Sequence, residues 1–249
     1  VFKILKKKLI NFVKHSNNFY NFKKKKPKKD YMDFLEGVII SIISYQKKVK
    51  IIQIGANDGV NGDPIYNIVK KYPSNIEYLG IEPDEPTFFE LQKNYHGMNN
   101  VFLVNRLIGD GSIINFYNFN KNFKKFDKHM SGLNSVHKEA MERQLSRRGL
   151  ENFNKYVDIK KCQSFTLKDA IQEYPQMIRA DVLQIDAEGF DDEIIYNSSI
   201  NEFNFKVINF ESKLLSSERF SKLKNFLEKN NFKIYKWKKS DTIAVRINI

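Results

Sequence analysis

A glycine-bearing loop and a distant carboxylate have the residue types of a nucleoside-binding site. The loop, Gly55-Ala56-Asn57-Asp58-Gly59, directly follows an apolar run, and its glycines permit tight turning and close approach of the backbone to a flat ligand. Glu82 ends a second apolar run, 27 residues after Gly55. A carboxylate there can accept one hydrogen bond at each oxygen from the two hydroxyls of a ribose. The sequence therefore predicts a nucleoside-containing ligand.

Two common nucleotide-binding motifs are absent. The dinucleotide pattern G-x-G-x-x-G would need glycine where Asn57 and Val60 stand, and the P-loop pattern G-x-x-x-x-G-K-[ST] does not occur. The remaining alternative is an ordinary strand-to-helix turn that contains glycine. The pairing of the loop with Glu82-Pro83 favours a ligand site over that alternative.

Carboxylates that follow two later apolar runs could carry the chemistry. Asp186 and Glu188 follow the first of these runs, and Glu211 ends the next. Such a set suits a general base, or a Mg²⁺ site with Asp186 and Glu211 as the candidate ligands. The structural alternative is that carboxylates are also favoured at helix starts by the helix dipole.

Histidines offer a second source of a general base. His129 and His137 flank the loop Ser131-Gly132-Leu133-Asn134-Ser135, whose place between the third and fourth core strands suits a lid over an acceptor. Histidine titrates near neutral pH, so either side chain could take a proton from an acceptor. The other two histidines of the chain, His15 and His96, are expected to be solvated.

Short apolar runs alternate with helical segments along the chain and must position these groups. The expected strands are 49–54, 76–81, 101–104, 113–119, 156–165, 181–185, 207–210, 233–237 and 242–247. The expected helices are 30–43, 63–71, 86–95, 139–147, 167–174, a helix that ends at 197, and 217–230.

This alternation predicts an α/β fold, an open and mostly parallel Rossmann-like sheet with helices on both faces. The last two strands are joined by too few residues for a crossover helix, so they must pair as an antiparallel hairpin. A parallel sheet closed by such a hairpin is typical of class I methyltransferases and uncommon in dehydrogenases.

Four segments in order resemble the FkbM-type S-adenosylmethionine (SAM)-dependent methyltransferases. They are IIQIGANDGVNGDPI (51–65), YLGIEPDEPTFFELQKNY (78–95), VLQIDAEGFDDEII (182–195) and VINFES (207–212). The resemblance runs from about residue 49 to 215 and is weak over 118–150. This sequence departs from the family at Gln53, where Asp is more frequent, and at Ala187, where Val is more frequent.

The resemblance implies a class I fold that binds SAM and methylates hydroxyl groups, mostly of sugars in glycans, lipids or natural products. It implies that the loop 55–59 contacts the amino-acid end of SAM, that Glu82 holds the ribose and that residues 105–107 lie beside the adenine. The implied donor-binding residues are Gly55, Ala56, Asn57, Asp58, Gly59, Glu82, Pro83, Asn105, Arg106, Leu107 and Asp186.

Positive charge is concentrated at the start of the chain. Residues 1–29 contain eleven lysines and no acidic residue, which leaves only +2 of the net charge of +13 for residues 30–249. Apolar residues at helical spacing along 1–14 indicate a basic amphipathic helix that could lie on an anionic membrane surface. The alternatives are a helix packed on the domain and a tether to an upstream region. We expect a leader and linker at 1–29 and a methyltransferase domain at 30–249, with a substrate-side insertion at about 112–165.

The composition limits where the protein is expected in the cell and which functions are expected of it. One cysteine fits a reducing compartment, and no apolar stretch approaches the roughly 20 residues that span a bilayer, so we expect a cytoplasmic protein, peripheral to a membrane if the leader binds one. The leading hypothesis is a SAM-dependent O-methyltransferase with a carbohydrate or glycoconjugate acceptor. The alternatives are a non-catalytic donor-binding partner of a glycosyltransferase and a nucleic-acid methyltransferase. The nearly neutral domain and the lack of a [DN]-P-P-[YFW] motif disfavour the last of these.

Overall fold

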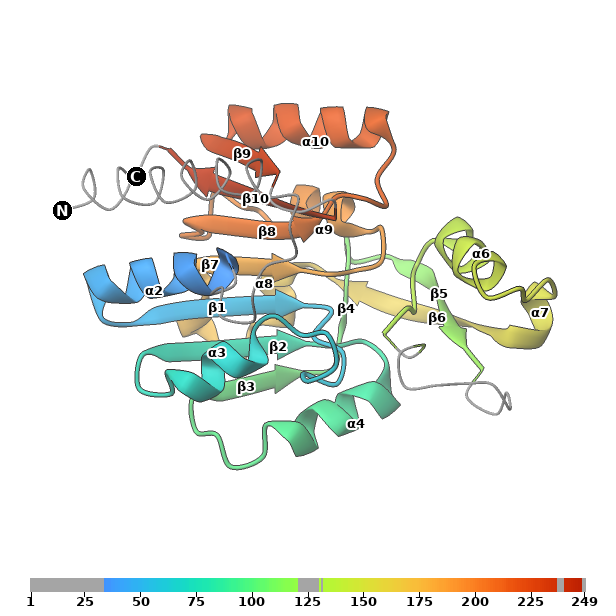
Figure 1. The fold of residues 1–249 in the computed structure, drawn as a ribbon, viewed down its shortest axis with the longest axis horizontal. Helices are drawn as coiled ribbons and strands as arrows, with labels where there is room; N and C mark the ends of the chain where they lie inside the picture. Colours follow the sequence, from blue (N-terminus) through green and yellow to red (C-terminus); the bar gives the residue numbers. More distant parts are fainter. Residues whose placement is uncertain (1–33, 121–129, 131, 237–239, 248–249) are drawn as a thin grey trace, which may run out of the picture.

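A seven-stranded sheet forms the centre of the computed structural model, which describes residues 34–120, 130, 132–236 and 240–247. Its strands are β1 (Val49–Ile54), β2 (Ile76–Ile81), β3 (Val101–Val104), β7 (Val182–Ile185), β8 (Val207–Glu211), β9 (Phe232–Lys236) and β10 (Asp241–Arg246). They lie in the order β3-β2-β1-β7-β8-β10-β9, and β10 runs antiparallel to both of its neighbours (Figure 1). The expected mostly parallel sheet with a closing antiparallel hairpin is confirmed.

Helices cover both faces of this sheet, as expected. On one face, α2 (Phe34–Gln46), α3 (Tyr66–Lys71) and α4 (Glu85–Asn94) pack in a single apolar cluster with alternate residues of β1 such as Ile51. On the other face, Ile52 belongs to a second cluster with α8 (Leu167–Ala170), the 3-10 helix η1 (Pro175–Arg179), α9 (Asp191–Asn197) and α10 (Ser217–Lys229). Because successive strand residues face opposite sides of the sheet, a continuously apolar strand contributes side chains to the apolar clusters on both faces.

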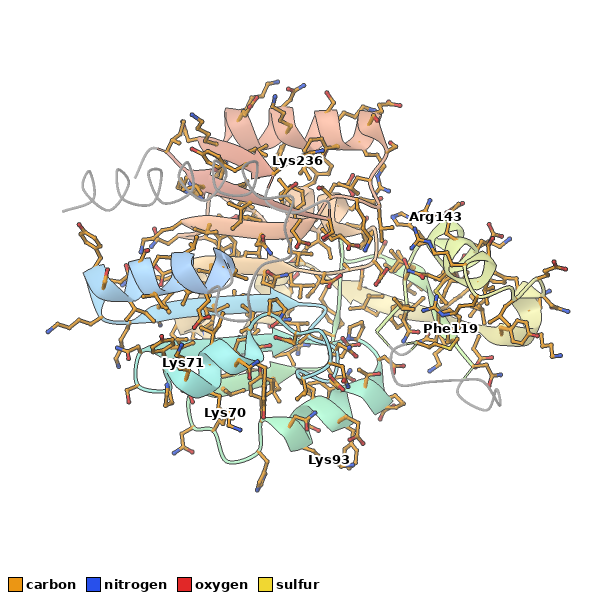
Figure 2. All side chains as sticks on the ribbon, in the orientation of Figure 1. Lys70, Lys71, Lys93, Phe119, Arg143 and Lys236 are labelled. Atoms are coloured by element: carbon orange, nitrogen blue, oxygen red, sulfur yellow. The ribbon has the colours of Figure 1, made fainter. Side chains whose placement is uncertain are left out.

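A smaller unit projects beyond the carboxyl ends of β1, β2 and β3 (Figure 1). It contains β5 (Ile113–Phe119), α6 (Lys138–Ser146), α7 (Phe153–Tyr156) and β6 (Val157–Phe165), and β6 also pairs with β4 (Leu107–Ile108). Its own apolar cluster includes Phe119, labelled in Figure 2, and Met141. The unit falls within the expected insertion at 112–165, whose division from the rest of the domain remains a prediction.

Several element boundaries differ from the expected ones for local reasons. The helix expected at 63–71 begins at Tyr66, because the side chain of Asp63 accepts from the backbone N–H groups of Ile65 and Tyr66 and holds a turn before the helix. The helix expected at 167–174 ends at Ala170 and is followed by η1. Strand β4 and helix α7 were not expected, since elements of two and four residues have no period to detect.

The leader at 1–29 and His129 lie outside the described residues. In the part of the chain that the structure describes, no helix has the length and apolar character needed to cross a membrane.

Candidate active site

A cavity opens at the carboxyl ends of β1, β2 and β7. Its volume is about 800 Å³, including the part open to solvent, and its wall draws on both the main sheet and the smaller unit. The main sheet supplies the loops after β1, β2, β3 and β7. The smaller unit supplies Phe116 of β5 and the segment 132–136, apart from Leu133. A site at this position agrees with the general rule that α/β sheets bind ligands beyond the carboxyl ends of their strands.

The loop after β1 owes its shape to residues with left-handed backbone. Gly55 has φ 76° and Asn57 has φ 49°. A Cβ atom at Gly55 would lie 1.9 Å from the carbonyl oxygen of Asp186, so only glycine fits where the loops after β1 and β7 meet. Gly55, Ala56 and Asn57 all line the cavity, and their expected contact with SAM remains a prediction.

Glu82 connects the end of β2 to that loop. Its Oε2 accepts from the backbone N–H of Asn57 (2.9 Å), and its Oε1 accepts from the backbone N–H of Asp84 (2.9 Å). The side chain is buried to 7% exposure and borders the cavity together with Pro83. A carboxylate oxygen has two lone pairs, so each can accept a second hydrogen bond from a ligand hydroxyl.

Asp58 and Gly59, which were expected at the donor, are not among the residues that line the cavity. The Asp58 side chain accepts from the backbone N–H groups of Val60 and Asn61 and thereby shapes the loop. Gly59 has φ 76° and lies against α4, where a Cβ atom would be 2.6 Å from the ring of Tyr95. In this structure both residues support the loop.

Of the residues expected beside the adenine, some line the cavity and one does not. Leu107 and Arg106 line the cavity, whereas Asn105 does not. The amide of Asn105 donates to the carbonyl oxygens of Glu82 and Pro83. The guanidinium of Arg106 donates to the carbonyl oxygens of Asp169 and Ala170 in α8, so its charge is engaged there.

Asp186 is the carboxylate that β7 delivers into the cavity. It directly follows the buried strand, and it is itself exposed and borders the cavity. Burial raises the pKa of Asp186 well above its ordinary value, and the negative charges of Asp191, Glu188 and Glu211 raise it further. A carboxylate in such surroundings is a stronger base than an ordinary aspartate.

Glu188 and Glu211 lie near Asp186 and do not line the cavity. The Glu188 side chain accepts from the amide of Gln144 in α6 at 3.4 Å, and burial followed by the charge of Glu211 raises its pKa to about 7. Glu211 Oε1 pairs with Lys213 Nζ at 2.6 Å. Of the three carboxylates expected to carry the chemistry, Asp186 alone has access to the cavity; their catalytic roles remain predictions.

His137 also lies outside the cavity wall. Its ring stacks edge-on against Phe190, and its Nε2 lies 3.6 Å from Glu193 and 3.4 Å from Arg219. Burial, followed by the positive charge of Arg219, lowers the pKa of His137. These contacts show that the His137 side chain packs between α6 and α9.

The described residues contain no cluster of three or more histidine, cysteine, aspartate or glutamate side chains arranged to hold a metal ion. The expectation of Mg²⁺ at Asp186 and Glu211 therefore gains no support. Two of the nearby carboxylates also have other partners, since Glu211 pairs with Lys213 and Asp191 Oδ1 accepts from the backbone N–H of Glu211.

The family model for the methyltransferase FkbM domain matches residues 53–234, which run from the end of β1 into β9 and include every cavity-lining residue. The chain belongs to this family. It is therefore a SAM-dependent methyltransferase with a Rossmann-like fold, as the four sequence segments predicted. No curated protein sequence is significantly similar to the chain.

Solved structures of several methyltransferases are distantly similar to this FkbM-family chain. Precorrin-6y C5,15-methyltransferase from Geobacter metallireducens shares 12% identity, with 90% of this chain and 94% of that chain covered and a TM-score of 0.42. The methyltransferase PaMTH1 of Podospora anserina, solved with S-adenosylhomocysteine (SAH), shares 9% identity, with 96% and 88% covered and a TM-score of 0.45. The family assignment rests on the sequence match.

The cavity suits SAM in charge and shape. Its charged lining residues are Asp63, Glu82, Asp186 and Arg106, and the guanidinium of Arg106 is bound at α8. Three carboxylates therefore face a ligand that carries a positive sulfonium. The carboxylate of Glu82 offers the paired acceptors that the ribose of a nucleoside requires. When bound, SAM supplies the electrophilic methyl group.

Sequence reasoning missed several cavity residues. Asp63 was expected only as the first residue of the helix 63–71. The signal that could have identified it is the polar residue Gln53, its hydrogen-bond partner, inside an otherwise apolar strand. Phe116 and Phe190 reach the cavity through long-range packing that no local pattern encodes.

Proposed function

We propose that this FkbM-family methyltransferase transfers the methyl group of SAM to a hydroxyl of a sugar or glycoconjugate. The observation that carries the proposal is the accessible carboxylate of Asp186, at the point where the loops after β1 and β7 meet. The sugar class is drawn from the resemblance of the four sequence segments to enzymes that methylate sugars.

Asp186 suits the requirement of hydroxyl methylation. Transfer from a sulfonium to oxygen is an in-line displacement, so the acceptor oxygen, the methyl carbon and the sulfur must be aligned. An alcohol is a weak nucleophile at neutral pH, and a carboxylate that accepts its proton makes the oxygen more reactive. The raised pKa of Asp186 favours this proton transfer, since a stronger base takes a proton from an alcohol more readily.

The wall that borders the SAM loop, residues 55–59, suits an acceptor with polar and apolar faces. Phe116 and Phe190 provide apolar surface, and Asn134 and Ser135 provide amide and hydroxyl groups. Gly132 packs on Asn57, where a Cβ atom would lie 2.7 Å from the Asn57 amide, so the acceptor side is in direct contact with the SAM loop. Mixed linings of this kind fix the orientation of small ligands.

The test is transfer of a radioactive methyl group from SAM to a panel of glycans, glycolipids, RNA and proteins by the full chain. We expect label in carbohydrate that survives mild alkali, because a methyl ether is stable where a methyl ester is cleaved. Label confined to RNA or protein would overturn the proposed acceptor. Binding of SAH without transfer to any acceptor of the panel would favour a non-catalytic donor-binding module.

A further inference from the structure

Asp63 is a cavity-lining carboxylate that the proposed chemistry does not use. It follows the SAM loop along the chain and precedes α3. Its Oδ1 accepts from the backbone N–H groups of Ile65 and Tyr66, and its Oδ2 accepts from the side-chain amide of Gln53 at 2.8 Å. The carboxylate is thus fixed in place by neutral donors.

Gln53 holds this carboxylate in one orientation. It is 2% exposed, near the end of β1, and its Oε1 accepts from the hydroxyl of buried Tyr78 at 2.9 Å. With the oxygen of the amide committed to Tyr78, the nitrogen is directed at Asp63. Buried polar chains of this kind are costly unless every member is satisfied, so they fix geometry where they occur.

The carboxylate of Asp63 lacks a counter-charge within the part of the chain that the structure describes. Among the described residues no lysine, arginine or histidine forms an ion pair with it. Burial raises the pKa of Asp63 to about 6, the result expected for a carboxylate that is partly desolvated without a cation. A cationic ligand group in the cavity would supply the missing partner.

We propose that Asp63 binds the ammonium group of the methionine portion of SAM and so selects intact SAM and SAH over adenosine thioethers that lack the amino acid. The proposal rests on the SAM site described above. The ammonium fits Asp63 better than the sulfonium does, because an ammonium has N–H groups to donate and a sulfonium has none. Asp63 and the turn at Gly55–Asn57 belong to one loop, and Glu82, on the neighbouring strand, remains for the ribose.

Asp63→Asn tests the proposal by calorimetry, with SAH and 5′-methylthioadenosine as ligands for the full chain at pH 7.5. The two ligands share the adenosine thioether, and only SAH carries the ammonium. We expect the variant to bind SAH at least about 10-fold more weakly, the usual scale for a hydrogen bond between charged groups. Its affinity for 5′-methylthioadenosine should change less than about twofold.

Two further variants keep the result interpretable. Asparagine and serine both retain an oxygen that can accept from the N–H groups before α3, so Asp63→Ser replaces Asp63→Asn if the latter does not fold. Glu218→Gln removes one negative charge from the exposed face of α10 and should leave both affinities unchanged.

Three outcomes would overturn the proposal, and they are distinct. Equal weakening of both ligands would mean that Asp63 only shapes the loop. Unchanged SAH affinity in the variant would place the ammonium elsewhere. If the wild-type chain bound neither ligand, the SAM site itself would be wrong, and the proposed function would fall with it.

Discussion

The backbone N–H of Asn57 donates to the carboxylate of Glu82 at 2.9 Å. This hydrogen bond joins the loop after β1 to the end of β2, two segments that both border the cavity. Glu82 therefore holds the loop after β1 in place with the same carboxylate that is expected to bind a ribose.

We predict that Glu82→Ala weakens SAH binding by about 1.5–3 kcal/mol, the range for hydrogen bonds to charged groups. Because the variant also leaves the N–H groups of Asn57 and Asp84 without their acceptor, its melting temperature should fall as well. Calorimetry and thermal unfolding measure the two effects. Glu77→Ala, on the same strand and away from the cavity, is the control, and an unchanged SAH affinity in Glu82→Ala would place the ribose elsewhere.

Gly55→Ala should be strongly destabilising. The substitution adds a Cβ atom 1.9 Å from the Asp186 carbonyl oxygen at a position with φ 76°, so the loops after β1 and β7 must separate. We expect a loss of at least about 2 kcal/mol in the free energy of unfolding, measured by urea titration. Gly62→Ala is the matched control, since Gly62 has φ 72° and no atom within 4 Å of the added Cβ. Equal losses in the two variants would show that the contact is unimportant.

Asp186→Asn should lower turnover at least about 100-fold with little change in fold, because the amide keeps the shape and removes the base. In the wild type, turnover should decline as pH falls, since a carboxyl group with a raised pKa protonates at higher pH than an ordinary aspartate. That decline should disappear in the residual activity of the variant. Wild-type turnover in Asp186→Asn would direct attention to Glu188 and His137.

Chelation should leave the wild-type activity unchanged. The described residues bring no set of metal-ligating side chains together, and Glu211, one of the two candidate ligands, is paired with Lys213. Methyl transfer is measured with and without EDTA, and then with added Mg²⁺. Activity that is lost with EDTA and restored by Mg²⁺ would revive a metal role for Asp186.

Asp191→Asn should stabilise the protein more at pH 8.5 than at pH 5. Asp191 is fully buried, and burial raises the pKa of its carboxyl group from 3.8 to about 7. A carboxyl group whose folded-state pKa is raised destabilises the fold as pH rises from the unfolded-state pKa towards the folded-state pKa. We therefore expect a gain of about 1–3 kcal/mol between the two pH values in unfolding experiments. A gain independent of pH would contradict the burial of a titrating charge.

The sheet could be predicted from the sequence because its strands are apolar runs bounded by turn residues. Four expected strands, 49–54, 76–81, 101–104 and 113–119, match β1, β2, β3 and β5 at both ends. The site was predictable where one strand end delivers one side chain, as at Glu82 and Asp186. The sequence could not show that Asn57 lines the cavity and Asp58 does not. Which loop residue faces the cavity depends on contacts of the loop with α4 and β7.

The position of β1 in the sheet has a consequence for how the enzyme is made. Strand β1 pairs with β2, the next strand of the sheet along the chain, and with β7, which begins more than 120 residues later. Pairing over such a separation requires closure of a long loop and comes late in folding. While β7 is still inside the ribosome, the nascent chain can form the turn at Gly55. It still lacks the part of the cavity wall that the loop after β7 supplies. SAM can therefore stabilise only a chain that has folded at least as far as α9, which supplies the last of the cavity-lining residues.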